Sequence, residues 1–530
     1  MKKTEMSTNS RDKMGTESEK KALLSASTSV VQEDGLHSPP AGEAFGKRHL
    51  LAVLAFLGFF NVYCLRVNLS VALVAMVNNT KKVTNHSMDA CPSIHGTDNS
   101  TTKQGDLDWD ESTQGIVLGS FFYGYIVTQL PGGWLAEVFG AKKLFGFGVL
   151  CTAALTLLTP VVVNDLGLGS FIALRVIEGL GEGVTFPAMS AMWGKWAPLW
   201  ERSKLAGFTY AGAQLGTVVS MPISGILCDS DFLGGWPSVF YIFGVLGCLW
   251  FVVWMLMVHD TPAKHPTISA EERTYIETSI GLKQRLRTPW KAILTSKAVW
   301  GICAGHFANN WGFYTMLTSL PTYMKQILNF DISENGFISA LPYVVCCICQ
   351  TSSGHIADFI RKNGYLSTRN TRKLFMTLGL MLPAILMFCI GYAGCNHVVV
   401  VTMLTFAVGL GGICMGGFNV NHLDIAPNFS GTLMGISNCL ATIPGFLGPY
   451  IVGRLTNNNQ TRAQWQIVFY ICSAVYLAGT ILYLLLAEGS EQPWNQQGGE
   501  VLTFSSPSSK EPRHEEQPTN LQYNTLQTEK

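Results

Sequence analysis

The sequence predicts an all-α membrane protein with twelve transmembrane helices, arranged as two pseudo-symmetric halves of six. Charged residues make up only 13% of the 530 positions, about half of the roughly 25% that is usual in soluble domains. Charge-poor runs of about 20 residues, long enough to cross about 30 Å of hydrocarbon, fill the middle of the chain. Since lipid allows only helices or closed barrels, runs of this length indicate helices.

Twelve apolar runs can be separated along the chain. The expected spans are 49–77, 113–136, 144–163, 170–193, 205–227, 238–258, 298–323, 336–357, 374–394, 397–422, 431–453 and 467–487.

The longest interior loop divides the spans into two bundles. The first bundle covers 47–258 and the second 298–488, with a loop at 259–297 between them. The tails 1–46 and 489–530 are polar, and we expect them to be disordered.

Lys and Arg residues gather on one side of the predicted membrane, which places both tails and the loop 259–297 in the cytosol. The loop 78–112 then faces the lumen or the exterior. It carries three N-x-S/T acceptors, at Asn78, Asn85 and Asn99, which are predicted glycosylation sites on that side.

The two halves repeat a short loop motif. GWLAEVFGAKK follows the second span and GHIADFIRK follows the eighth; each reads Gly, three residues, an acid and then basic residues. Such a repeat indicates a duplicated six-helix unit. We expect Glu137, Lys142 and Asp358 to form a gating loop.

The polarity of the spans also repeats, with a period of three helices. Spans 3, 6, 9 and 12 carry no charged residue, whereas spans 1, 4, 7 and 10 hold the charged and titratable groups. Spans 2, 5, 8 and 11 carry uncharged polar residues, expected at an interface: Gln129, Gln214, Gln350 and Asn438. This pattern is typical of the major facilitator fold.

Three charges on span 4 raise the question of what they do inside an apolar run. Arg175, Glu178 and Glu182 lie on one helix face at i, i+3 and i+7. Glu178 is one turn from Arg175, so one acid of the two has no base on this helix. We interpret the surplus acid as the proton carrier and leave open which acid it is. The alternative is a fixed ion-pair lock between helices.

Other polar residues in the spans are candidates for the substrate site. Arg66 stands alone on span 1 and suits a carboxylate, because a guanidinium binds one through two parallel hydrogen bonds; snorkelling to the interface is the alternative. His306, Asn310 and Tyr314 form a polar stripe on span 7, where His306 either titrates or only packs. For Asp424 we favour capping or pairing with loop arginines.

Several functional classes have no support. The net charge of +1 gives no basic surface for nucleic acid, and no Walker lysine motif, metal cluster or nucleophile arrangement is evident. We therefore expect neither an enzyme nor a cofactor or metal, with protons as the coupling ion, although an anion channel stays open. Of the fourteen cysteines all but Cys91 lie in or beside apolar runs, which indicates helix packing rather than a disulfide framework.

Longer motifs then identify a family. CLRVNLSVAL, GSFFYGYIVTQLPGG, RVIEGLGEGVTFPAM, YAGAQLGT, LPTYMK and FNVNHLDIAP resemble the anion transporter family that includes sialin, the vesicular glutamate transporters and the sodium-phosphate type transporters. The resemblance covers about 48–488 and is strongest to the sialin branch. It implies proton-coupled symport of sialic acid and similar acidic sugars out of the lysosome by alternating access. Vesicular glutamate or aspartate uptake and sodium-phosphate type transport are the alternatives.

The resemblance also implies roles for particular residues. It makes Arg66 the binding residue for the substrate carboxylate and assigns proton coupling to Arg175, Glu178 and Glu182. It places Tyr123, His306, Asn310 and Tyr314 at the substrate.

Two departures separate the chain from the glutamate branch, as the resemblance has it. That branch carries a histidine in place of Leu118 and an arginine in place of Asn309. A single arginine favours a monocarboxylate.

The tails carry candidate sorting signals. Glu19, Leu23 and Leu24 resemble an acidic dileucine signal, which predicts a clathrin adaptor as partner and the lysosomal membrane as location; a synaptic vesicle or the plasma membrane stays open. Tyr523 and Leu526 fit a weaker tyrosine-based signal.

Overall fold

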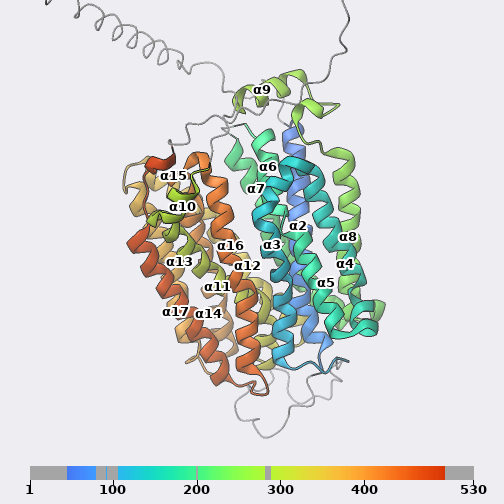
Figure 1. Ribbon diagram of the computed structural model, residues 1–530. Helices are drawn as coiled ribbons and strands as arrows, with labels where there is room; N and C mark the ends of the chain where they lie inside the picture. The colour runs from blue at the N-terminus through green and yellow to red at the C-terminus, as the bar shows by residue number, and fades with distance from the viewer. Residues whose placement is uncertain (1–44, 79–90, 92–104, 199–200, 281–287, 496–530) are drawn as a thin grey trace, which may run out of the picture.

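The computed structural model describes residues 45–78, 91, 105–198, 201–280 and 288–495. This part of the chain is helical; strand pairing within it is limited to one isolated bridge between Val77 and Leu107. Two bundles stand side by side, coloured blue to green and yellow to red in Figure 1. The predicted fold class is confirmed.

The first bundle holds the first six spans. Its helices are α2 (Lys47–Met76), α3 (Glu111–Phe139), α4 (Ala141–Val161) with its π-helical extension η2 (Val162–Leu166), α5 (Gly167–Glu182), α6 (Thr185–Trp196), α7 (Arg202–Asp229), the 3₁₀ turn η3 (Phe232–Gly234) and α8 (Trp236–Met257). Span 4 therefore consists of two helices, α5 and α6.

The second bundle holds the other six, after a connector. The connector contains η4 (Pro262–Lys264), α9 (Ala270–Ile280) and α10 (Trp290–Thr295). The bundle contains α11 (Lys297–Gln326), α12 (Ile332–Lys362), α13 (Thr368–Ile390), α14 (His397–Gly409), η5 (Leu410–Gly416), α15 (Phe418–Ile425), η6 (Pro427–Phe429), α16 (Ser430–Thr456) and α17 (Arg462–Leu486), followed by η7 (Pro493–Asn495). Span 10 is broken into α14, η5 and α15.

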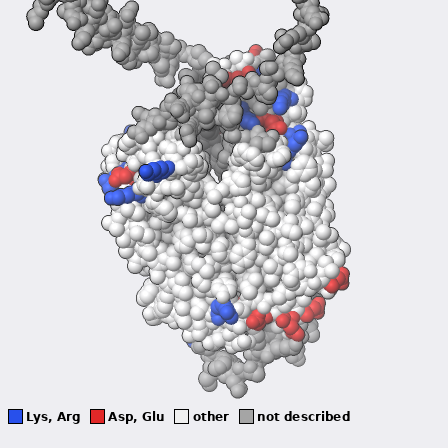
Figure 2. Space-filling model, viewed as in Figure 1, with Lys and Arg blue, Asp and Glu red and all other residues white. Residues whose placement is uncertain are grey.

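Hydropathy alone finds nine helical stretches in the described residues that could cross a membrane. One of them, Ala141–Trp196, is 56 residues long and makes two crossings as α4 and then α5 with α6. The helices α3 and α11 line the interface between the bundles. With 29 and 30 residues they are long enough to cross a membrane, but they are too polar for hydropathy alone to find them. In Figure 2 the described charges lie at the two ends of the molecule, with an uncharged belt between them.

The predicted interface residues pair across the two bundles. Gln129 of α3 accepts a hydrogen bond from Asn438 of α16 at 2.9 Å. Gln214 of α7 donates one to Gln350 of α12 at 3.2 Å. The polar residues of spans 2, 5, 8 and 11 therefore lie where the period of three helices predicted them.

The bundles pack tightly at one end. We call this end luminal because the loop 78–112 leaves from it. Gly115 and Gly119 of α3 lie so close to Pro449 and Phe446 of α16 that an added Cβ would touch the opposing backbone. Toward the cytosolic end of α16, by contrast, a Cβ on Gly435 would meet no heavy atom within 4 Å. The tight contact between α3 and α16 is thus at the luminal end, with the hydrogen bond from Asn438 to Gln129 nearer the middle.

Close packing of α5 against α3 presents the charged face of span 4 to the centre. A Cβ on Gly179 would overlap the carbonyl oxygen of Phe121 and approach the backbone nitrogen of Tyr125 to 2.9 Å. We predict that Gly179→Ala lowers the free energy of unfolding by about 1–3 kcal/mol, because α5 must move away from α3.

Thermal unfolding of the purified protein in detergent measures this effect. Gly207→Ala is the matched control, since its Cβ would enter open space on α7 and alanine favours helix. Equal melting temperatures for the two variants would contradict the packing argument.

Candidate functional site

An ion pair between spans 1 and 4 lies at the centre of the first bundle. Arg66 Nε donates a hydrogen bond to Glu182 Oε1 at 2.6 Å, and Arg66 Nη2 donates to the same oxygen. The two side chains are 3% and 0% exposed. The expectation of a surplus acid on span 4 was therefore wrong for this conformation, because the base that pairs with Glu182 comes from another helix.

The second pair forms within span 4, at the spacing the sequence predicted. Arg175 Nη1 donates to Glu178 Oε2 at 2.5 Å. Thr156 of α4 donates its hydroxyl to the other oxygen of Glu178 at 3.2 Å. Two arginines and two glutamates thus form a buried, charge-balanced centre.

Aromatic rings surround the Arg66 guanidinium. The ring centroids of Tyr63, Phe121 and Tyr125 lie 4.7, 5.2 and 4.6 Å from its central carbon. Ring faces attract a cation, most strongly where water is excluded. Tyr123, expected at the substrate, packs its ring against that of Phe446 of α16, with the planes tilted by 45°, and is 41% exposed. Of the two α3 tyrosines, Tyr125 is the one that reaches the arginine.

Some polar atoms of this centre have no hydrogen-bond partner among the described residues. These atoms are Arg66 Nη1, Arg175 Nε and Glu182 Oε2. A cavity of about 20 Å³ adjoins both arginines, room for about one water molecule. Buried polar atoms normally have partners, so the centre has unused capacity for a proton, a water molecule or an anionic group.

The stripe on α11 divides between two surroundings. His306 stacks on Phe418 at 4.4 Å and shares the Ser437 hydroxyl with His422, at 3.1 and 2.9 Å. Asn310 donates to the Ala441 carbonyl at 3.0 Å. These contacts hold both residues against the second bundle.

Tyr314, one turn further along α11, points to the first bundle. Its ring meets that of Phe122 edge-to-face, with centroids 4.8 Å apart. Phe122 in turn meets Tyr125 of the aromatic group around Arg66. Of the predicted stripe, Tyr314 is therefore the residue connected to the arginine.

Comparison with known proteins agrees with this architecture. A family model described as Major Facilitator Superfamily matches residues 51–449. Human sialin is 51% identical over 454 residues, which cover 84% of this chain and 90% of sialin. Bovine vesicular glutamate transporter 1 is 41% identical over 455 residues, covering 84% and 78%.

The chain belongs to the major facilitator superfamily, in the family of sialin and the vesicular glutamate transporters. It is a multi-pass membrane transporter. Solved structures share the fold: a bacterial homologue of the lysosomal transporter Spinster has a TM-score of 0.62 at 13% identity, covering 83% of this chain and 96% of that one. A D-xylose-proton symporter has the same score at 15% identity, covering 83% and 97%.

The loops expected to gate this major facilitator protein differ between the bundles. The amide of Lys142 donates to Asp260 at 2.9 Å, so that carboxylate caps the start of α4. Asp358 is largely exposed, 4.0 Å from Arg361. The side chain of Glu137 lies outside the described residues.

Asp424 pairs with basic residues, as favoured from the sequence. Arg372 Nε donates to it at 2.7 Å, and Arg361 lies 3.8 Å away. Of the predicted glycosylation sites, Asn78 is partly buried. The other two and both tail signals fall outside the described residues: Asn85, Asn99, Glu19, Leu23, Leu24, Tyr523 and Leu526.

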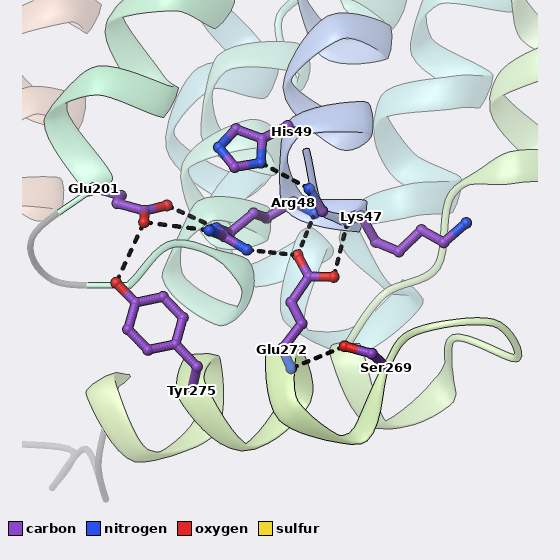
Figure 3. Close-up of polar contacts among 8 residues, drawn as sticks. Lys47, Arg48, His49, Glu201, Ser269, Glu272 and Tyr275 are labelled. Carbon is purple, nitrogen blue, oxygen red and sulfur yellow. Dashed lines mark hydrogen bonds and ion pairs between the residues drawn. The ribbon is translucent and has the colours of Figure 1, made fainter. Parts of the chain in front are cut away.

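A second polar cluster at the cytosolic end joins the connector to the first bundle (Figure 3). Glu272 of α9 accepts hydrogen bonds from the amides of Lys47 and Arg48 at 2.9 and 3.1 Å, and from Arg48 Nη1 at 2.9 Å. It thereby caps α2, whose N-cap residue, Gly46, offers no side chain. Arg48 also pairs with Glu201 at 2.7 Å, so α9 is fastened to α2.

The cluster shifts the protonation of Glu201. Burial by itself raises the pKa of this carboxyl, but hydrogen bonds and attraction from Arg48 outweigh burial and leave the pKa below its usual value. Because the pKa is lower in the folded state, Glu201 stabilises the fold at neutral pH. That contribution is lost as the pH falls through the lowered pKa.

We predict that Glu272→Ala lowers the free energy of unfolding by about 3 kcal/mol, because Arg48 and the start of α2 lose a buried carboxylate. Thermal unfolding in detergent measures the loss. Glu271→Ala, at the exposed neighbouring position, should leave the melting temperature unchanged. Equal losses in both variants would mean that the contacts of Glu272 do not stabilise the fold.

Proposed function

We propose that the chain is a secondary active transporter that carries an organic monocarboxylate together with a proton by alternating access. The observation that carries this proposal is the ion pair between Arg66 and Glu182, buried between spans 1 and 4. Because Glu182 already occupies the Arg66 guanidinium, a substrate carboxylate that binds there must compete with the Glu182 carboxylate.

Protonation of Glu182 decides that competition. As a carboxylate, Glu182 occupies Arg66 through two hydrogen bonds. As a neutral acid it no longer balances the guanidinium, which is then available to an anion. Proton and anion therefore favour each other's binding, and such a coupling is reciprocal by thermodynamic linkage.

Charge balance in the centre explains why the two move together. With both glutamates ionised and no substrate, Arg66, Arg175, Glu178 and Glu182 sum to zero. With one proton and one monoanion bound, the sum is again zero. A proton alone or an anion alone leaves one unbalanced charge, which is costly in the low-dielectric core. The empty and fully loaded carriers are the forms that can reorient.

The surroundings of Arg66 favour a hydroxyl-rich monocarboxylate. Tyr63 and Tyr125 bring phenol groups to the guanidinium, and Tyr314 approaches across the bundle interface. One arginine is available, because Arg175 is held by Glu178. Sialic acid and similar acidic sugars fit this description, and human sialin is a relative at 51% identity.

The proton gradient of an acidic organelle would drive export. A difference of about two pH units supplies about 2.7 kcal/mol per proton, or near 100-fold accumulation in the cytosol. We place the protein in the lysosomal membrane, with the loop 78–112 in the acidic lumen and the N-terminal tail in the cytosol.

We predict that Glu182→Gln separates exchange from net transport. The amide cannot balance Arg66, so the empty carrier keeps one positive charge and should not reorient, whereas the anion-loaded carrier is neutral. Uptake into proteoliposomes driven by a pH gradient should fall more than tenfold, while exchange of anion for anion continues and loses its pH dependence. Gradient-driven uptake at the wild-type rate would show that Glu182 carries no proton.

Arg66→Lys tests the carboxylate site. Lysine keeps the charge but lacks the planar guanidinium, which can donate two parallel hydrogen bonds to a carboxylate. Each charge-assisted hydrogen bond contributes about 1.5–3 kcal/mol. The affinity for a radiolabelled acidic sugar should fall more than tenfold, and its methyl ester should not compete in the wild type. Unchanged affinity in Arg66→Lys would mean that Arg66 only anchors the helix at the membrane interface. A preference for glutamate would point to a vesicular glutamate carrier, and a linear, unsaturated current would point to a channel.

Lysosomal location is tested at the N-terminal tail. Leu23→Ala combined with Leu24→Ala should move the protein to the cell surface, because a clathrin adaptor would no longer bind the dileucine signal. Surface biotinylation quantifies the change. Replacement of Leu36 by Ala in the same tail is the control, and lysosomal staining that persists in the double variant would rule out this signal.

A further inference from the structure

A disulfide joins the luminal sides of the two bundles. Cys91, in the connection between α2 and α3, bonds to Cys395, in the connection between α13 and α14, with their Cα atoms 5.3 Å apart. The two residues are 304 positions apart in sequence. Cys91 was the cysteine that stood apart from the apolar runs, although its partner could not be predicted from the sequence.

The connection that carries Cys91 has its base on the first bundle. The amide of Asn78 donates to the Leu107 carbonyl at 2.9 Å, and the amide of Leu107 donates to Met76 at 3.0 Å. Both ends of the connection are therefore tied to the end of α2.

Cys91 itself lies on the second bundle. The amide of Cys91 donates to the Ile327 carbonyl at 3.1 Å, and Asn329 Nδ2 donates to the Cys91 carbonyl at 2.5 Å. Cys91 is 2% exposed. Ile327 and Asn329 connect α11 to α12, so these contacts and the disulfide all hold Cys91 on the second bundle.

We propose that Cys91–Cys395 is a covalent staple that holds the two bundles together on the luminal side, while the connector at 259–297 holds them on the cytosolic side. The bridge forms when both thiols lose a proton and an electron to an oxidant of the secretory pathway, where disulfides persist. It closes a covalent ring around most of the transport core. Twelve other cysteines of the described residues are free thiols in the helices.

The staple does not prevent the bundles from rocking. Cys91 is 14 positions from Val77 and 16 from Leu107, and an extended chain spans up to about 3.5 Å per residue. Either arm can therefore extend to about 45 Å, which lets the bridge stay closed while the bundles move. The bridge should stabilise the folded transporter without being opened in each cycle.

Cleavage of the connector tests the staple directly. A protease site placed within residues 281–287 allows the purified, folded protein to be cut between the bundles. On a denaturing gel without reductant the cut protein should run as one species, and a thiol reductant should release two fragments. Two fragments without reductant would overturn the proposal.

Single substitutions test the pairing. Cys91→Ser and Cys395→Ser should each release two fragments without reductant after the cut. Cys389→Ser is the matched control, because Cys389 is a free thiol on the neighbouring α13, and it should leave the cut protein as one species. Release of fragments by the control, or no release by either bridge variant, would assign the link to other cysteines.

Two measurements distinguish an effect of the staple on stability from an effect on transport. Reductant should lower the melting temperature of the wild type by several degrees and leave that of Cys91→Ser unchanged. Transport by Cys91→Ser well below its melting temperature should match that of the wild type within about twofold. Transport lost from folded Cys91→Ser would make the bridge part of the transport cycle, and an unchanged melting temperature in the reduced wild type would show that it stabilises nothing.

Discussion

The buried ion pair between Arg66 and Glu182 constrains the rest of the structure. An arginine in the apolar core is tolerated only with a partner, and in this conformation its partner is an acid from span 4. In the proposed mechanism, an anion binds at Arg66 once Glu182 is protonated or displaced. Coupling between proton and anion would then follow from the shared guanidinium, without a signal passed over a distance.

The fold supplies what this interaction requires. Gly179 lets α5 approach α3, which presents the acids of span 4 to the centre and brings the rings of Phe121 and Tyr125 over the arginine. The rings exclude water and so strengthen the ion pair. At the luminal end α3 and α16 are in close contact. The two bundles thus meet on the luminal side, and the central charges balance one another.

Much of this architecture could be predicted because local sequence encodes it. Hydropathy and the period of three helices predicted the spans, and Gln129 and Asn438 pair across the interface as that period implied. Arg175 and Glu178 are one turn apart, so their contact needed no tertiary information. The pairing of Asp424 with a basic residue was likewise favoured from its place at the end of a span.

The remaining contacts join positions far apart in sequence. Arg66 and Glu182 are separated by 116 residues, and nothing in either helix alone shows that they face each other. The resemblance named Tyr123 but not Tyr125, and the rotation of α3 that brings Tyr125 to Arg66 could not be read from a helix that is apolar on most sides. The bridge from Cys91 to Cys395 depends on how two loops from different halves meet.

Proton uptake on anion binding is the most direct test of the shared guanidinium. The purified transporter in weakly buffered detergent solution, near neutral pH, is mixed with a saturating acidic sugar while a pH indicator or calorimetry in two buffers counts the protons. If the anion displaces Glu182 from Arg66, about one proton should be taken up for each anion bound, and Glu182→Gln should take up none. Saturable binding without proton uptake in the wild type would contradict the competition between the substrate and Glu182.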